Sequence, residues 1–343
     1  KVKDMNALFG RCSALTELDL TSFNTANVSE MSYMFTGCSA LKAIDLRSFN
    51  TGQTKYMSEM FKGCSALEAI DLTSFNTANV EGMSGMFEGC SALKAIDLTH
   101  FNTANVEGMS KMFKGCAALE AIDLTHFNTA NVVGMNEMFK GCAALKTIDL
   151  THFNTENVTA MNEMFEGCAA LKMLDLKNFN TEKVTDMTGM FKDCAELTDI
   201  ISEKAWQCEE SEDMFKGCVR LKGAVAYDDK KTDDEMANPE TGYFTGSKLE
   251  AYVLQNPEKT TLTFYYDGQR AKRTGTTWDI NEKLSTYYSY PVYMAWTGTH
   301  ESPNTTITKV VFDASFKDYR PVTTALWFRY LQALTTFEGW ENL

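Results

Sequence analysis

A long repeat of constant period runs through the first two thirds of the chain and restricts what it can fold into. Every twenty-sixth residue from Cys12 to Cys194 is a cysteine, which gives eight copies, and Cys218 follows after an interval shorter by two. A phenylalanine lies three residues before each of these cysteines, and a leucine lies three residues after each. Nine aligned copies predict a solenoid, because a single copy of this size cannot bury its own apolar side without its neighbours.

One half of each repeat has the pattern of a short strand. Leu41, Ile44 and Leu46 are apolar, and Ile44 and Leu46 alternate with polar Asp45 at the period of two that a half-buried strand requires. Stacked repeats would place these segments side by side, with about 4.8 Å between strands. The sequence therefore predicts a parallel sheet along one side of the solenoid, ending in a last strand near residues 221–226.

The other half of each repeat has the pattern of a short helix with one apolar stripe. Thr77 or Asn79 can cap its start, and Gly89 can end it in the left-handed conformation. The apolar residues are spaced by three, three, one and three positions, which suits one helix face: Val80, Met83, Met86, Phe87 and Cys90. We expect one strand and one short helix in every turn.

The cysteine and methionine columns are interpreted as core. Thiols on neighbouring turns would lie about 5 Å apart, within disulfide reach, but they point the same way and each would have two equal partners. We therefore expect a ladder of reduced, buried thiols. Cys208 lies off the period, and its pairing with Cys218 is left open. No cysteine spacing matches a zinc motif. Sixteen of the 19 methionines fall in two repeat columns, which favours core filling over a methionine-rich peptide groove.

A column of aspartates is the main candidate for a binding surface. It alternates with inward Ile and Leu residues, so we expect it to face solvent on the concave side. Neighbouring carboxylates about 5 Å apart repel by ~0.8 kcal/mol in water and ~3 kcal/mol at an effective dielectric of 20. Hydrogen bonds from threonines two residues on, a bound cation or a basic partner can offset this repulsion. The column comprises Asp19, Asp45, Asp71, Asp97, Asp123, Asp149 and Asp175.

Two hypotheses follow for this column. The first is that like-charge neighbours raise the pKa values of the inner aspartates. The second is that a macromolecular partner binds there. The residues assigned to that partner site are Asp45, Asp71, Asp97, Asp123, Asp149, Thr73, Thr99 and Thr125.

Three flanking columns shape the same surface. Small alanines, such as Ala43 and Ala95, would leave it shallow and open to a broad partner. Arg47 and Lys177 stand near the ends of the acidic stripe. His100, His126 and His152 share one column, and three imidazoles near carboxylates can hold a transition metal. Duplication is the simpler explanation, because serines occupy the same column in earlier repeats, and we assign no metal and no cofactor.

The repeat resembles that of the BspA-like leucine-rich-repeat proteins of bacterial surfaces, which carry motifs of the Met-Phe-x-Gly-Cys and Phe-Asn-Thr type. The resemblance covers residues 1–246 and extends more weakly beyond them. It implies an α/β solenoid, a right-handed superhelix with a parallel sheet, together with export and, for some members, adhesion to host or bacterial surface proteins.

The repeat pattern also divides the chain. We predict a solenoid of about nine turns at residues 1–226, a cap or linker at 227–246 and a β-rich segment at 247–343. In that last segment we expect a hairpin of strands 260–266 and 274–280 around Asp267 and Gly268, and a strand at 310–312. Residues 327–337 repeat the Met-Phe-x-Gly-Cys frame with Leu331 in the cysteine position, which predicts one further repeat.

Composition narrows the class of function. The net charge of −14 disfavours nucleic acid and anionic membranes, and no apolar run approaches the roughly 20 residues of a membrane-spanning helix. Every candidate catalytic residue is one of many copies, whereas active sites are usually unique, so we expect no enzyme. Lys1 is not an initiator methionine, and we expect the natural protein to extend beyond both ends.

The sequence predicts an extracellular or cell-surface recognition module that binds a protein or glycan on a host or neighbouring cell. A structural spacer or coat component without a specific ligand is the alternative.

Overall fold

The computed structural model divides the chain into two compact units, Lys1–Gly246 and Ser247–Leu343, which are described separately. It describes residues 2–246, 250–267, 270, 273–280, 294, 296–297, 299, 301–319, 321 and 327–343.

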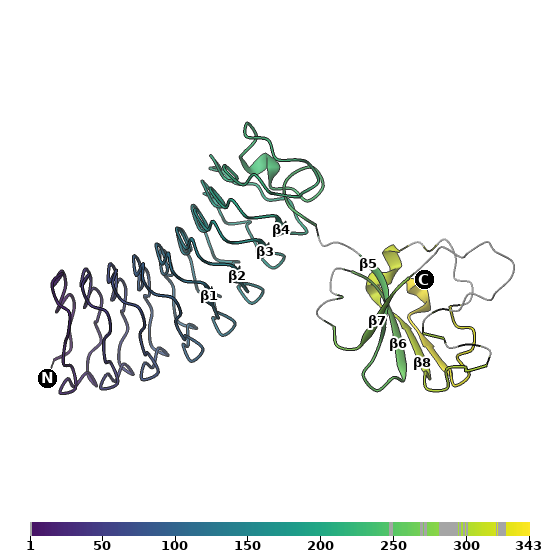
Figure 1. The fold of residues 1–343 in the computed structure, drawn as a ribbon, viewed down its shortest axis with the longest axis horizontal. Helices are drawn as coiled ribbons and strands as arrows, with labels where there is room; N and C mark the ends of the chain where they lie inside the picture. The colour runs from purple at the N-terminus through teal and green to yellow at the C-terminus, as the bar shows by residue number, and fades with distance from the viewer. Residues whose placement is uncertain are drawn as a thin grey trace. The chain divides into compact units, whose positions relative to one another are not determined.

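The N-terminal unit is a stack of similar turns, each formed by one repeat (Figure 1). Equivalent residues on successive turns pair in parallel along the whole array, which is the geometry that the sequence period predicts. The paired residues are Asp4, Glu30, Tyr56, Gly82, Gly108, Gly134, Ala160, Asp186 and Glu210.

The segment that was predicted to be a helix instead forms a hydrogen-bonded ladder between turns. The backbone N–H groups of Tyr33 and Phe35 donate to the carbonyls of Ser58 and Met60 on the next turn, both at 2.9 Å. The N–H of the intervening Met34 bonds back to the carbonyl of Met31 within the same turn, at 3.3 Å, and that of Thr36 bonds back to the carbonyl of Tyr33 at 3.0 Å. Alternate residues thus bond between turns and within a turn. The helix prediction is wrong: across residues 2–246 the one helix is the three-residue 3₁₀ helix η1 (Asp234–Met236).

Two left-handed residues in each turn explain why no helix forms. In the second turn they are Tyr33, with φ of 60°, and Gly37, with φ of 74°. A right-handed helix cannot pass through such residues, and isolated helices of this length are only marginally stable. Gly89 has the left-handed conformation that its place in the repeat predicts, with φ of 74°, but it belongs to this ladder and not to a helix end.

The strand side of the solenoid is less regular than a continuous sheet. Two separate parallel pairs form, β1 with β2 and β3 with β4, with Ile122 opposite Ile148 and Leu174 opposite Ile200. In the earlier turns the same segments keep the alternation of buried and exposed residues without being strands. Residues 221–226 form no strand either. The strand bounds are β1 Ala121–Ile122, β2 Thr147–Ile148, β3 Met173–Asp175 and β4 Asp199–Ile201.

A column of buried threonines joins the turns at the corner that follows the strand side. The Thr103 hydroxyl donates to the carbonyl of Asn128 at 2.9 Å and accepts from the N–H of the same residue at 2.7 Å. A side chain therefore takes the place of a backbone pair at this corner. Sequence reasoning did not assign this role to the threonine of the Phe-Asn-Thr motif. The column comprises Thr25, Thr51, Thr77, Thr103, Thr129 and Thr155, all at most 1% exposed.

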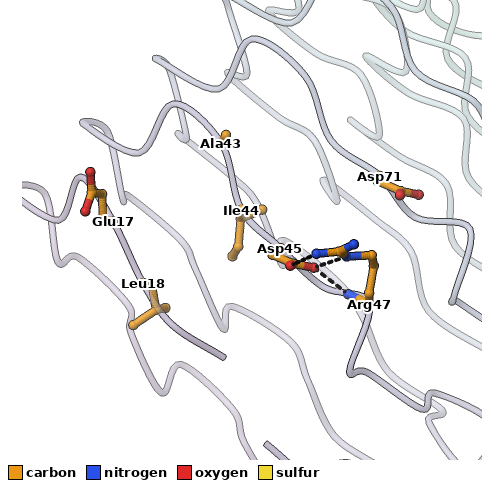
Figure 2. Close-up of a pocket in the computed structure, with 7 residues that line it drawn as sticks. All are labelled: Glu17, Leu18, Ala43, Ile44, Asp45, Arg47 and Asp71. Atoms are coloured by element: carbon orange, nitrogen blue, oxygen red, sulfur yellow. Dashed lines mark hydrogen bonds and ion pairs between the residues drawn. The ribbon is translucent and has the colours of Figure 1, made fainter. Parts of the chain in front are cut away.

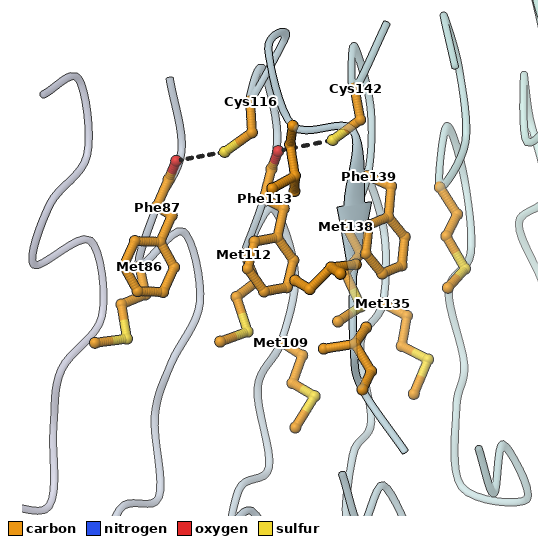
Figure 3. Close-up of a cluster of buried hydrophobic side chains, with 14 of the residues drawn as sticks. Met86, Phe87, Met109, Met112, Phe113, Cys116, Met135, Met138, Phe139 and Cys142 are labelled. Carbon is orange, nitrogen blue, oxygen red and sulfur yellow. Dashed lines mark hydrogen bonds between the residues drawn. The ribbon is translucent and has the colours of Figure 1, made fainter. Parts of the chain in front are cut away.

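The core consists of stacked columns of identical side chains (Figure 3). The rings of Phe87 and Phe113 lie 5.9 Å apart, and those of Phe113 and Phe139 lie 5.7 Å apart, nearly parallel in both pairs. The Cys116 thiol donates to the carbonyl of Phe87 at 3.2 Å. All ten cysteines are free thiols, and eight of them are buried, as the repeat predicts.

The pair left open by the sequence, Cys208 and Cys218, is not bonded. The Cys208 thiol donates to the carbonyl of Glu210, and the Cys218 thiol donates to the carbonyl of Phe191.

Residues 227–246 cover the last turn of the array. Tyr243 and Phe244 are fully buried and meet the ring of Phe215 edge-on, at 5.4 and 6.0 Å. The backbone of this segment runs so close to the turn that a Cβ at Gly223 would lie 2.4 Å from the carbonyl oxygen of Gly242. Gly223 thus permits the close approach.

The C-terminal unit contains a five-stranded mixed sheet in the order β7-β5-β6-β8-β9. Strand β5 is antiparallel to both β6 and β7, whereas β8 is parallel to β6 and to β9. The elements are β5 Glu250–Gln255, β6 Thr261–Asp267, β7 Thr276–Asp279, β8 Lys309–Phe312, η3 Ala314–Asp318, β9 Thr336–Glu338 and η4 Trp340–Asn342.

The three predicted strands of this unit are present as β6, β7 and β8, but β5 was not predicted and one pairing differs. The predicted hairpin of residues 260–266 and 274–280 is wrong, because β5 lies between β6 and β7. Gly268, its predicted turn residue, is outside the described residues. Leu331 in the further repeat donates its N–H to the carbonyl of Phe328, as Cys38 does to Phe35 in the main array.

The threonine column makes a testable contribution to stability. Thr103→Val keeps the shape of the side chain but removes the hydroxyl that serves both backbone groups of Asn128. We expect the free energy of unfolding to fall by about 1–2 kcal/mol in urea unfolding followed by circular dichroism. Thr103→Ser keeps the hydroxyl and is the matched control, with an expected loss below about 1 kcal/mol. Equal losses in the two variants would contradict a hydrogen-bonding role.

The thiol ladder predicts a pattern of chemical labelling. Burial raises the pKa of Cys64 and of Cys142 to about 12 and that of Cys208 to about 11, so these thiols are almost entirely protonated at pH 8 and react slowly even where a reagent reaches them. In the folded chain we expect a thiol reagent to label Cys12 rapidly, because Cys12 is exposed, and Cys208 more slowly. The eight buried thiols should react only after unfolding. Fewer than ten thiols in the unfolded chain would show that some are paired.

Candidate functional site

The aspartate face, defined as the seven aspartates Asp19, Asp45, Asp71, Asp97, Asp123, Asp149 and Asp175, follows the strand side of the first seven turns. The residues before and after each aspartate point inward, and the first six carboxylates are exposed while Asp175 is half-buried. The alternation of the strand segments is the local cause, because every second residue must point away from the core.

Each aspartate in the middle of the face is held by the threonine two residues later. Oδ1 of Asp97 accepts from the backbone N–H of Thr99 at 3.0 Å and from its hydroxyl at 2.7 Å. The same two bonds join Thr73 to Asp71 and Thr125 to Asp123, at 2.6–3.0 Å. The predicted bonding between aspartates and threonines is confirmed.

Basic residues replace the threonine near each end of the face. Arg47 donates Nε to Oδ1 of Asp45 at 2.9 Å and places Nη2 2.5 Å from Oδ2, so the two side chains form a two-point ion pair (Figure 2). Lys177 lies 3.3 Å from Asp175. These cations neutralise their own turns and leave the threonine-bound aspartates as the anionic part of the face.

The hypothesis of raised pKa values is wrong. Hydrogen bonds from the Thr99 hydroxyl and N–H lower the pKa of Asp97, and the equivalent bonds from Thr73 and Thr125 lower the pKa of Asp71 and Asp123. Hydrogen bonds from Arg47 lower the pKa of Asp45 to about 2. Repulsion between neighbouring aspartates is the weaker effect because water surrounds these exposed groups and screens it.

Two shallow hollows lie along this surface and differ in chemistry. The first has a volume of 390 Å³ and lies around Asp45 and Arg47 (Figure 2). The second has a volume of 540 Å³ and is lined mainly by apolar groups, including Ile148 and Met173, between Lys146 and Lys172. Met173 is 54% exposed.

Sequence reasoning did not identify this second hollow. The available signal was a break in one column, where the alanines of earlier turns, such as Ala121, give way to Thr147 and then to Met173. Because the repeat keeps an alanine at this position in earlier turns, the change to methionine indicates a role other than packing between turns.

In the histidine column, His100 contacts a backbone carbonyl of the preceding turn, as the serine at the same position does one turn earlier. Nε2 of His100 lies 2.8 Å from the carbonyl of Leu72, where Ser74 one turn earlier donates its hydroxyl to the carbonyl of Leu46 at 3.0 Å. Within the described residues no group of three or more His, Cys, Asp or Glu side chains is arranged to hold a metal ion.

One known family matches most of the N-terminal unit. The sequence matches the family described as "Mycoplasma protein of unknown function, DUF285" over residues 1–95, 66–152 and 117–227. The chain belongs to the DUF285 family. Comparison with curated proteins finds no match.

Among solved structures, the DUF285 chain is similar to a leucine-rich repeat protein from Bacteroides ovatus, with 19% identity, 65% of this chain and 58% of the other covered, and a TM-score of 0.41. A leucine-rich repeat protein from Eubacterium ventriosum matches at 16% identity, with coverages of 51% and 58% and a TM-score of 0.32. A leucine rich cell surface protein from Faecalibacterium prausnitzii matches at 18% identity, with coverages of 58% and 64% and a TM-score of 0.27. The chain spans less than two thirds of each.

None of the helices in the described parts of this DUF285 chain has the length and apolar content that a bilayer crossing requires.

The hydrogen bonds of the aspartate face predict the effect of removing one threonine hydroxyl. Thr99→Val should raise the pKa of Asp97, measured by NMR titration of the side-chain carboxyl carbon, because the hydroxyl contributes most to lowering it. Thr99→Ser keeps the hydroxyl and should leave the pKa low.

The same pKa shift sets a pH dependence. Since the folded pKa of Asp97 is below its unfolded value of about 3.9, ionisation of Asp97 stabilises the fold above about pH 4, and this contribution is lost as the pH falls through the folded pKa. Thr99→Val should therefore flatten the loss of stability on acidification. An unchanged pKa in Thr99→Val would contradict this origin of the shift.

Proposed function

We propose that this protein is a non-enzymatic recognition module of a bacterial cell surface, which binds a protein partner through the aspartate face. The observation that carries the proposal is the difference in hydrogen bonding between the two oxygens of each carboxylate. In Asp71, Asp97 and Asp123, Oδ1 is bonded to the following threonine, whereas within residues 2–246 no protein group donates to Oδ2. Each of these three turns thus offers one fixed, exposed acceptor.

The spacing and charge of these acceptors favour a basic partner. Acceptors on successive turns repeat at about the 4.8 Å of adjacent strands, and arginine and lysine side chains form their strongest hydrogen bonds with carboxylates. The lowered pKa values keep the row charged at neutral and mildly acidic pH. Because two hydrogen bonds already fix each carboxylate, binding loses little side-chain freedom.

The apolar hollow at one end of the face supplies an anchor. Binding energy in protein interfaces concentrates in a few buried apolar contacts, which charged contacts surround and orient. Met173 and Ile148 provide such a surface beside Lys146 and Lys172. The partner favoured by this arrangement carries a row of basic residues that continues into an apolar side chain.

Several features favour recognition over catalysis. The polar groups of the face occur in many equal copies, and eight of the nine cysteines in the repeat column are buried, with burial raising the pKa of Cys64 and of Cys142. The BspA-like resemblance of the repeat agrees with export and adhesion, and the net charge of −14 disfavours nucleic acid.

The test compares two variants of the full chain with equal charge. The first carries Asp71→Asn, Asp97→Asn and Asp123→Asn, which keep the acceptor for each threonine. The second carries Glu156→Gln, Glu182→Gln and Glu209→Gln, which remove three exposed carboxylates outside the aspartate face. Candidate partners are found by screening extracellular proteins for binding to the chain. The affinity of each partner is then measured with the wild-type or variant chain immobilised on a surface.

We expect saturable binding that the Asp variant weakens about tenfold, since three partly exposed charge contacts of about 0.5 kcal/mol each sum to roughly one factor of ten. The Glu variant should bind like the wild type. Equal affinity of both variants would exclude the aspartate face, and a chain without any saturable partner would support a structural spacer.

A further inference from the structure

A neutral hollow in the C-terminal unit is distinct from the aspartate face. It has a volume of 350 Å³, and its apolar part consists of Trp278, Trp296 and Pro303, while Gln255, Thr305 and Thr306 provide polar groups. Every described residue that lines it is neutral, in a chain where 23% of residues are charged. This composition disfavours an ionic ligand.

The sheet places the side chains of Trp278 and Gln255 on one of its faces. Trp278 in β7 is paired with Val253 in β5, and Gln255 lies two residues after Val253 on the same strand. Side chains two positions apart share a face, and cross-strand neighbours lie beside each other. Trp278 is half-buried, so part of its ring borders the hollow.

The charged residues of this sheet region lie on its opposite face. Tyr252 precedes Val253 and therefore points the other way. The Arg273 guanidinium bonds to the Tyr252 hydroxyl at 2.7 Å and stacks over the ring of Tyr265, 3.6 Å from its centroid. The fold thus separates an arginine–tyrosine cluster from the neutral tryptophan side.

The floor of the hollow is held rigidly. Trp296 is 3% exposed, and its indole N–H donates to the carbonyl of Trp327 at 2.8 Å. The rings of Trp278 and Trp296 lie 6.3 Å apart and are inclined by 52°. Two indoles at an angle form an apolar corner with a fixed shape.

The polar rim is positioned by Asn304. Its Nδ2 donates to the carbonyl of Trp296 at 3.0 Å, and its Oδ1 accepts from the N–H groups of Thr306 and Ile307 at 2.9 and 3.1 Å. Asn304 is therefore occupied in holding the loop that carries Thr305. Among the described residues, the Gln255 amide and the Thr305 hydroxyl have no hydrogen-bond partner, so both are available to a ligand.

We propose that this hollow binds a neutral saccharide. A pyranose ring has an apolar face of C–H groups, which packs on an indole, and a rim of hydroxyls, which match amide and hydroxyl groups. The volume of 350 Å³ is near the lower end of the ~300–1,000 Å³ range of ligand pockets and suits one or two sugar rings. An extended proline-rich peptide also packs on aromatic rings, but it needs a longer groove.

The inference goes beyond the proposed function, because it concerns another unit and another ligand class. The two are distinguishable in one experiment: the Asp71→Asn, Asp97→Asn, Asp123→Asn variant should bind its protein partner about tenfold more weakly and keep saccharide binding unchanged.

The test uses the full chain and isothermal titration calorimetry. The probes are the methyl glycosides of glucose, galactose and mannose, N-acetylglucosamine oligosaccharides, sialylated and sulfated oligosaccharides, and a ten-residue proline-rich peptide. We expect at least one neutral saccharide to bind, with the weak affinity of about 0.1–1 mM typical of a shallow site, and no binding of the charged sugars or the peptide.

Variants identify the site. Trp278→Ala should weaken saccharide binding about tenfold or more, Trp278→Phe should keep it within about threefold, and Gln255→Ala should weaken it about threefold or more. Trp340→Ala is the matched control, because Trp340 is 52% exposed in the same unit and does not line the hollow. NMR shifts of the Trp278 indole N–H on titration of the wild type give a readout that does not depend on a variant folding.

The proposal is overturned if no neutral saccharide binds at about 20 mM, if Trp278→Ala and Trp340→Ala bind equally well, if the indole signal of Trp278 does not shift, or if charged sugars or the peptide bind in preference.

Discussion

The hydrogen bonds between turns are the constraint on which the N-terminal unit depends. In the segment of each turn that contains the Met-Phe pair, which we call the Met-Phe side, every second backbone N–H group donates to a carbonyl on the next turn. The N–H of Tyr33, for example, donates to the carbonyl of Ser58, and that of Phe35 donates to the carbonyl of Met60. A single turn therefore leaves these groups unpaired, and stability arises between neighbours rather than within a turn. Because the offset is constant, every side chain lies beside its equivalent on the next turn, which explains why the repeat is so uniform in the core columns.

Stacking identical residues has different consequences for apolar and charged columns. Phenylalanine rings and thiols gain packing from like neighbours, whereas like charges repel. On the Met-Phe side the chain alternates signs, and Lys62 and Lys140 each form ion pairs with two glutamates. On the aspartate face the sign does not alternate, and threonine hydrogen bonds stabilise Asp71, Asp97 and Asp123 within their own turns. In these three carboxylates Oδ1 is bonded to the threonine, and Oδ2 receives no hydrogen bond from residues 2–246.

The sequence predicts correctly which side chains are buried. It fails to predict the backbone conformation where the hydrogen-bond partner of a backbone group lies on another turn. Spacings of three, three, one and three identify Met83, Met86 and Phe87 as core residues, and they are fully buried. The same spacings fit a helix, whose N–H groups bond four residues back, and a ladder, whose N–H groups bond to the following turn. Non-glycine left-handed residues such as Tyr33 and Lys111 settle the choice, and their residue types carry no signal for that conformation.

At the candidate site, the sequence predicts which groups meet but not which effect is stronger. The period places Thr99 two residues after Asp97, so their bonding follows from the pattern. The sign of the pKa shift depends on a balance between a hydrogen bond of 2.7 Å and repulsion through water, and exposure decides that balance. Charge spacing alone, without the exposure and the bond length, gave the wrong direction.

The two proposed binding sites suit different kinds of ligand, because one is built from repeated residues and the other is not. A face made of equal copies gives no single turn priority, so it suits a partner long enough to contact several turns, and its affinity is the sum of modest contacts. A small ligand needs groups that converge from different directions, which a stack of identical turns cannot provide. In this chain such convergence occurs where the simple repeat ends, at the mixed sheet that brings Gln255, Trp278 and Trp296 around one hollow.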